Sequence, residues 1–339
     1  MFDFLHNPPL NRELINMLGG DRVNMLSITP NAQQKSKKDN QALSETLHCA
    51  ISRPFSFSLE SFSFLLSLCE AYGRVGVIAS ANKMLYEASR THNNCIQIIP
   101  NIDNGSVESG VREALSNGVK CFFVPYLNED ILTSNLYLDE ILHSCFSVWD
   151  ISYALALNLP LPKNANFMLI NGENLGVLRG YGILCSKKSD FFGLSALSMY
   201  LEIENLYEVF IKAISLKQEC SGIDYACRFF EHIKEILHDD VYRFYNTPKN
   251  TLPLGLVSSR ARNLIQSLLF DDISLINGVD CLYGFSSPSF VLQLMGFSED
   301  RARELLCLSF NNQNIDDTTI KESAIKIANN FLQLKKLQG

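Results

Sequence analysis

The sequence lacks the marks of several protein classes. Its 29 basic and 36 acidic residues leave a formal net charge of −7, so no basic surface for nucleic acid is predicted. It has no run of about 18 apolar residues, which argues against a membrane helix. The opening letters MFDFLHNPPL do not resemble a signal peptide. We therefore expect a cytoplasmic protein that partners neither nucleic acid nor a membrane.

Cysteine is present, but without the spacing of a metal site. None of the ten cysteines forms a CxxC pair, so no zinc or iron–sulfur centre is predicted. In a reducing cytoplasm we expect free thiols that mostly act as small buried hydrophobic side chains. Glycine and proline, 18 and 11 residues, are too few for a low-complexity chain. With 47% hydrophobic residues, the composition is that of a globular protein.

Short β-rich segments alternate with helical ones over the first two thirds of the chain. This alternation predicts a layered α/β domain, followed by a smaller α+β domain. Strands are expected at 75–80, 95–100, 119–127, 146–150, 167–171 and 181–187, and helices at 11–19, 58–72, 107–117, 198–245, 289–307 and 316–336. Ser58 is the predicted N-cap of the helix over 58–72.

Residues 276–310 carry the sharpest signal. Their letters, INGVDCLYGFSSPSFVLQLMGFSEDRARELLCLSF, resemble the C-terminal segment of cysteine desulfurases, which are pyridoxal-phosphate (PLP) enzymes of the class V aminotransferase family. The family pattern there is S-G-S-A-C-T-S-G, E-P-S-H-V-L, a-h-G-L-S and I-R-L-S, and its spacing from cysteine to proline is matched without a gap. Further matching segments, at 57–68, 125–130, 148–162 and 171–184, follow in the family's order.

The resemblance implies an architecture, a cofactor and partners. The fold would be that of PLP-dependent transferases of the aspartate-aminotransferase type (fold type I). A large α/β domain with a mostly parallel sheet would cover 11–210, and a small α+β domain would be built from 1–10 and 211–339. PLP is the implied cofactor. The implied partners are a second copy or a related desulfurase in a dimer, and an iron–sulfur scaffold or other sulfur-acceptor protein.

Three matched positions correspond to cofactor contacts in the family. Asp150 stands where a carboxylate keeps the pyridine nitrogen protonated. Asn128 matches the asparagine beside the ring hydroxyl, and Ser61 matches the threonine of the phosphate-binding loop. The plain alternatives are, in turn, an exposed acid, a turn residue and an ordinary first helical turn. Beside Ser61, Leu59 replaces the loop glycine and Glu60 adds a negative charge, and both changes disfavour phosphate.

Four groups on which the family's chemistry depends are absent. Asn174 stands where the lysine forms the Schiff base with PLP, and an amide nitrogen forms no imine. Asn82 replaces the histidine that stacks on the ring, and Cys307 replaces the arginine that clamps the substrate carboxylate. The arginine of the family's R-S-G-T-E-N segment is missing from YLEIEN at 200–205.

Cys281 is the matched group that keeps a chemical role. In the family this cysteine lies on a mobile loop and attacks the substrate sulfur, so Cys281 is a persulfide candidate. Its neighbour Asp280 does not favour the thiolate, and an inert loop cysteine is the alternative.

Three hypotheses about function stay open at this point. The first is a catalytically degenerate relative of cysteine desulfurases that acts as an interaction, regulatory or sulfur-handling subunit. The second is an active PLP-dependent cysteine desulfurase or class V aminotransferase with an unusual site, which needs a lysine from elsewhere or a noncovalently held cofactor. The third is a persulfide carrier that uses Cys281 without PLP.

Overall fold

The structure is a computed structural model that describes residues 2–4, 10–19, 30–177, 179–187, 205–216, 223–278, 287–310 and 316–338. Its strands are β1 (Phe2–Asp3), β2 (Ile51–Ser56), β3 (Val75–Ile78), β4 (Cys95–Ile98), β5 (Cys121–Pro125), β6 (Phe146–Asp150), β7 (Phe167–Asn171), β8 (Tyr181–Ser186), β9 (Val241–Arg243), β10 (Thr251–Leu256), β11 (Ile273–Ser274) and β12 (Leu305–Ser309). Its helices are α1 (Arg12–Gly19), α2 (Pro30–Thr46), α3 (Leu59–Glu70), α4 (Lys83–Ser89), α5 (Glu108–Ser116), α6 (Leu138–Ile141), α7 (Ser152–Ala156), α9 (Leu206–Ser215), α10 (Tyr225–Leu237), α11 (Ala261–Leu268), α13 (Phe290–Leu294), α14 (Glu299–Arg303) and α15 (Asp317–Gln338). Short 3-10 helices are η1 (Gly172–Leu175), η2 (His238–Asp240) and η3 (Leu269–Asp271).

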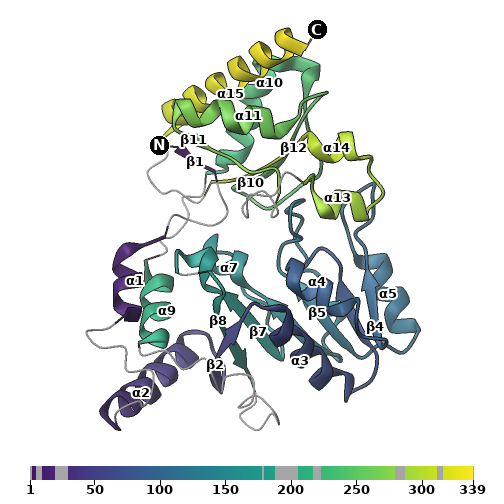
Figure 1. The fold of residues 1–339 in the computed structure, drawn as a ribbon. Helices are drawn as coiled ribbons and strands as arrows, with labels where there is room; N and C mark the ends of the chain where they lie inside the picture. The colour runs from purple at the N-terminus through teal and green to yellow at the C-terminus, as the bar shows by residue number, and fades with distance from the viewer. Residues whose placement is uncertain are drawn as a thin grey trace.

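A seven-stranded sheet covered by helices on both faces forms the large body, at the bottom of Figure 1. The strand order is β2-β8-β7-β6-β5-β3-β4. The strands from β4 to β7 are parallel, whereas β8 is antiparallel to β7 and to β2. The mostly parallel sheet that the sequence predicts is therefore present.

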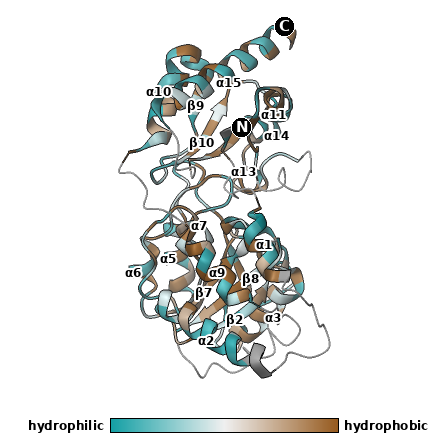
Figure 2. Ribbon diagram, turned by 90° about the vertical axis from the view of Figure 1, so that its left-hand side faces the viewer, coloured by the Kyte–Doolittle hydropathy of each residue, from teal (hydrophilic) through white to brown (hydrophobic). Residues whose placement is uncertain are grey.

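Strand β5 shows why the strands of this sheet have unbroken apolar sequences. Phe122 and Val124 face a core cluster that includes α1, α5 and α9, while Cys121 and Phe123 face the cluster under α3 and α4. Because helices cover both faces of the sheet, both sets of side chains must be apolar. In Figure 2 the central strands β7 and β8 are accordingly brown, while the outer helix α2 is mostly teal.

Helix α3 begins where the sequence predicts. The Oγ atom of Ser58 accepts a hydrogen bond from the backbone N–H of Ser61 at 3.3 Å, which makes Ser58 the N-cap. Phe62 and Leu66 lie on the inner face of the helix and are fully buried. They hold α3 against the sheet next to the strand ends described below.

The small body, at the top of Figure 1, is built on the antiparallel sheet β12-β10-β9. Helices α10, α11 and α15 pack around its core, which contains Phe4 together with residues from 226 to 331. The Phe4 ring makes edge contacts with Phe229 and Phe310. Helix α9 instead packs in the core of the large body.

Two helix predictions in the C-terminal part need correction. The segment 289–307 forms α13, α14 and the start of strand β12, because Gly296 turns the chain at φ 95° and β12 pairs with β10. Within 198–245, residues 241–243 form strand β9. Both strands depend on pairing with β10, a long-range contact that local apolar spacing does not report.

Candidate functional site

The carboxyl ends of β5, β6 and β7 lie next to one another at one edge of the large sheet. In the parallel register Pro125 lies opposite Asp150, and Asp150 lies opposite Leu169. Ligand crevices of open α/β sheets occur at this edge. Asn128 follows β5, Asp150 ends β6 and Asn174 follows β7, so the fold brings these three predicted positions to the same edge, called the carboxyl edge below.

Asp150 is held by the protein itself. Its Oδ1 accepts hydrogen bonds from the backbone N–H and the hydroxyl of Ser152, at 3.0 and 2.5 Å. The Ser152 Oγ in turn accepts from the Asn171 N–H at 2.7 Å, which ties β6 to β7. Burial raises the pKa of Asp150, and the two hydrogen bonds from Ser152 oppose that rise.

The side-chain amide of Asn128 is fully engaged by protein groups. Its Nδ2 donates to Thr133 Oγ1 at 2.6 Å and to Asn135 Oδ1 at 3.3 Å. Its Oδ1 accepts from the Ser80 hydroxyl at 2.6 Å and from Asn135 Nδ2 at 2.7 Å. Both donors and both acceptor positions are used, so the amide closes the loop after β5 and has no hydrogen-bonding capacity left for a ring hydroxyl.

A cavity between Asn82 and Asp150, the two positions that match ring contacts in the family, is nearly filled. Its remaining walls are Phe62, Ala81, Leu85, Phe123, Val124, Pro125, Val148 and Leu169. The free space measures about 10 Å³, which is room for about one water molecule. Small-molecule sites measure roughly 300–1,000 Å³. The residues present therefore do not fit the pyridine ring of PLP.

The N-terminus of α3, which contains Ser61, is also occupied. Hydrogen bonds from its own backbone N–H and from the Ser58 side chain lower the pKa of Glu60. Glu60 lies in the first turn of α3, where a negative charge interacts favourably with the helix N-terminus. Its charge repels a second anion such as a phosphate group.

Several carboxyl groups gather at the carboxyl edge, and sequence reasoning missed one of them. Glu129 is 9% exposed, and its Oε2 accepts a hydrogen bond from the Tyr153 hydroxyl at 3.2 Å. Burial raises the pKa of Glu129 well above its ordinary value, and the nearby Asp130 and Asp150 raise it further. This environment favours the neutral acid and disfavours an anionic ligand.

Asn174 lies in η1, directly after β7, and is 6% exposed. Lys83 follows the cavity residue Asn82 in sequence, but its ammonium lies toward the small body, 5.8 Å from the centre of the Phe290 ring. Cys281, the persulfide candidate, lies outside the described residues, so its role stays a prediction.

The loop after β5 closes against the small body. The Ser289 hydroxyl donates to Asp130 Oδ2 at 2.6 Å, and the Cys307 thiol donates to the Asp130 carbonyl oxygen at 3.1 Å. A Cβ atom on Gly278 would lie only 2.8 Å from Asp130 Oδ1. Cys307, at the position of the family's carboxylate clamp, is therefore fully buried and is occupied by contacts within the protein.

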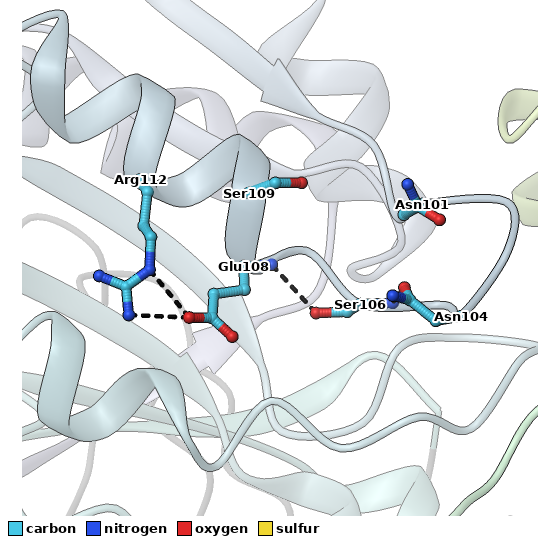
Figure 3. A pocket seen from close by; sticks show the side chains of 6 residues that line it. All are labelled: Asn101, Asn104, Ser106, Glu108, Ser109 and Arg112. Atoms are coloured by element: carbon cyan, nitrogen blue, oxygen red, sulfur yellow. Dashed lines mark hydrogen bonds and ion pairs between the residues drawn. The ribbon is translucent and has the colours of Figure 1, made fainter.

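A larger hollow of about 310 Å³ lies over the loop between β4 and α5 (Figure 3). It is lined by Asn101, Asn104, Ser106, Glu108, Ser109 and Arg112. The Arg112 guanidinium pairs with the Glu108 carboxylate at 2.7 Å, and the Glu108 N–H donates to Ser106 Oγ at 3.2 Å. The two charges neutralise each other, so this hollow has the character of a polar surface.

Within the described part of the chain, no helix has the length and apolarity that a bilayer crossing requires. Nor do those residues contain a cluster of three or more His, Cys, Asp or Glu side chains arranged to hold a metal ion.

Solved structures with this fold include NifS-like proteins and aminotransferases. A NifS-like protein from Rickettsia africae matches with a TM-score of 0.73 and 14% identity, over 98% of this chain and 99% of that one. A second NifS-like protein matches with a TM-score of 0.70 and 11% identity, over 98% of this chain and 99% of that one. The subgroup IV aspartate aminotransferase from Thermus thermophilus matches with a TM-score of 0.64 and 10% identity, over 98% of this chain and 99% of that one.

No family model and no curated protein sequence matches the chain. The structural matches cover nearly its whole length. The chain therefore has the aspartate-aminotransferase-like fold of PLP-dependent enzymes, and the fold class predicted from the sequence is confirmed.

Proposed function

We propose that the chain is a cysteine desulfurase-like protein without PLP-dependent activity, which serves as an interaction or regulatory subunit in sulfur handling. The observation that carries this proposal is the filled cavity between Asn82 and Asp150, which keeps about 10 Å³ of free space. Phe62 and Leu85 form part of its wall, so side chains of α3 and α4 take the room that a cofactor ring needs.

Three further requirements fail independently of that cavity. Asn174 supplies no amine for covalent attachment of an aldehyde. Glu60 holds the helix N-terminus against a phosphate. Cys307 is a buried thiol bonded to Asp130 and provides no bidentate clamp for a carboxylate. A single loss can be compensated, whereas these losses affect binding, attachment and substrate orientation separately.

A subunit role is supported by what the chain keeps. Both bodies have closed apolar cores, so the fold is maintained although the site is not. Large apolar side chains are exposed on both bodies, among them Phe64 on α3 and Phe270 in η3, the latter 94% exposed. Exposed apolar groups of this size suit contact with another chain. A second copy or a related desulfurase is the partner that we propose.

The catalytic half of the proposal is tested by product release. The full-length protein is incubated with L-cysteine and added PLP, beside an active cysteine desulfurase as positive control. We expect no alanine or sulfide above the no-protein control, and we expect Asn174→Lys alone not to restore release. Release by the unmodified chain that Cys281→Ala abolishes would overturn the proposal.

The subunit half is tested with a cysteine desulfurase from the same genome. The two purified proteins are mixed, and the elution volume and the desulfurase rate are measured with and without this chain. A shifted elution volume or a changed rate supports the subunit role. If both stay unchanged, and the chain alone elutes as a monomer, the subunit role is wrong.

A further inference from the structure

Two thiols and two serine hydroxyls meet where β2 begins and β8 ends, at the edge of the large sheet opposite the carboxyl edge. Ser52 lies opposite Cys185 in the antiparallel register of β2 and β8. The Ser52 Oγ lies 3.6 Å from Cys49 Sγ and 3.6 Å from Cys185 Sγ. The Ser44 Oγ lies 3.0 Å from the same hydroxyl. Both sulfur atoms therefore lie next to the same hydroxyl oxygen, one on each of two chain segments.

The two cysteines differ in their access to solvent. Cys185 is fully buried on β8, whereas Cys49, in the segment between α2 and β2, is half-buried. A small reagent from solution therefore reaches Cys49 first. Cys185 is positioned behind it to react with whatever forms on the Cys49 sulfur.

Hydrogen-bond donors around Cys49 favour its thiolate. The Cys185 thiol contributes most, followed by the hydroxyls of Ser52 and Ser44 and the Ile51 N–H, and together they lower the pKa of Cys49 to about 6 against the effect of burial. The same contact raises the pKa of Cys185. These surroundings favour the thiolate at Cys49 and the thiol at Cys185.

A second pair of neighbouring thiols in the large body shows the contrast. Cys69 on α3 and Cys121 on β5 also hydrogen-bond to each other, and both are fully buried. Their contact and their burial raise the pKa of Cys121 well above its ordinary value. Both thiols of this pair are shielded from solvent, as expected of cysteines that only pack.

We propose that Cys49 is a peroxide-reactive thiol and that Cys185 is its resolving partner. The inference is independent of the proposed function. In the first step the Cys49 thiolate attacks one oxygen of hydrogen peroxide, the O–O bond breaks, and the leaving hydroxide takes up a proton to become water. The product is a sulfenic acid on Cys49.

In the second step the Cys185 sulfur attacks the sulfenic sulfur. The S–S bond forms, the S–O bond breaks, and the hydroxyl leaves as a second water with the proton of Cys185. The two thiols lose two electrons in total, and the peroxide gains them. The resulting disulfide would fasten the segment after α2 to β8 and is reversible by thiol reductants.

The test is peptide mapping of the full-length protein after limited treatment with hydrogen peroxide. We expect a Cys49–Cys185 linked peptide, lighter by two hydrogens than the sum of its parts and absent after reduction. In Cys185→Ala we expect a sulfenic acid on Cys49 that dimedone traps. The matched control is Cys227→Ser, because Cys227 is half-buried like Cys49 but its thiol donates to the Glu231 carboxylate. This variant should form the same linked peptide.

A second readout keeps the proposal falsifiable if the disulfide is reduced during handling. The rate of Cys49 alkylation by iodoacetamide is followed against pH by mass spectrometry. We expect a midpoint near pH 6 in the unmodified protein, and a higher midpoint in Cys185→Ala, because the strongest donor is lost. Absence of the linked peptide together with the same midpoint in both proteins would overturn the proposal, as would faster crosslinking of Cys69 to Cys121.

Discussion

The pKa values of titratable groups are shifted toward the neutral form at one edge of the large sheet and toward the charged form at the other. At the carboxyl edge, burial dominates and raises the pKa values of Glu129 and Asp150, which favours their neutral forms. At the opposite edge, donors outweigh burial and lower the pKa of Cys49. The difference teaches that the donors aimed at the charged form, rather than burial itself, decide whether a buried group stays reactive.

The packing around the polar groups also differs between the two edges. At the carboxyl edge the polar side chains bond to one another and apolar side chains close the cavity beside them. At the opposite edge one thiol stays accessible from solution. Under the two proposals made above, the reactive group of this chain lies at the edge opposite the one where open α/β sheets bind ligands.

Replacing Phe62 should have the largest effect, because this side chain closes the cavity. Phe62 is fully buried, and its ring makes edge contacts with the rings of Phe55 and Phe57. The distances between ring centres are 5.3 and 5.6 Å. We expect Phe62→Ala to lower the free energy of unfolding by about 4 kcal/mol in urea titrations. Phe64→Ala, on the exposed side of the same helix, should change it by about 0.5 kcal/mol or less. Equal effects of the two variants would show that the cavity is not closed by packing.

Replacing Asn128 should have the next largest effect. Asn128→Ala removes a hydrogen-bond partner from the buried polar groups of Ser80, Thr133 and Asn135, so we expect a loss of about 3 kcal/mol in unfolding free energy. Asn82→Ala removes only the cap of α4, in which Asn82 Oδ1 accepts from the Met84 N–H, and should cost about 1 kcal/mol. A small effect at Asn128 would mean that its amide is not engaged and is available to a ligand.

The raised pKa of Glu129 predicts a pH dependence of stability. The neutral carboxyl contributes its full stabilisation below the ordinary pKa of about 4.5, and this is lost as pH rises toward the higher pKa of the folded protein. The loss is at most about 1.4 kcal/mol per pH unit. The glutamine of Glu129→Gln cannot ionise. The unfolding free energy of this variant should therefore fall less steeply than that of the unmodified protein as the pH rises above about 4.5.

Glu113→Gln, at an exposed position of α5, is the matched control for Glu129→Gln and should follow the unmodified protein at every pH. Parallel curves for Glu129→Gln and the unmodified chain would show that Glu129 is already ionised at the carboxyl edge. That result would break the comparison between the two edges.

The buried strands of the large sheet and its edge strand β4 could be predicted from the sequence, whereas the other edge strand, β2, could not. The run at 119–127 contains β5, which is covered on both faces and must be apolar throughout. Strand β2 was not predicted, because ISRPFS is half polar and contains Pro54. It is the last strand of the sheet and pairs only with β8, a position where the missing N–H of proline is tolerated.

Of the candidate site, the sequence could predict only the positions of residues that lie at or directly after the ends of parallel strands. Asn128, Asp150 and Asn174 meet at one edge because their strands are parallel neighbours. The hydrogen bond between Glu129 and Tyr153 joins the loop after β5 to helix α7, and no local sequence pattern predicts it. The neighbouring positions of Cys49 and Cys185 depend likewise on the pairing of β2 with β8, which the sequence alone did not reveal.

The central claim is that this fold no longer binds PLP at the carboxyl edge. Trp149 is the single tryptophan, is fully buried and precedes Asp150 directly, so a ring bound at Asp150 would quench its fluorescence. The most direct measurement is a titration of the full-length protein with PLP, followed by Trp149 emission and by visible absorbance after gel filtration, with Asp150→Asn in parallel. We predict no saturable quenching and no retained absorbance in either protein. Saturable quenching in the unmodified chain that is lost in Asp150→Asn would contradict the account.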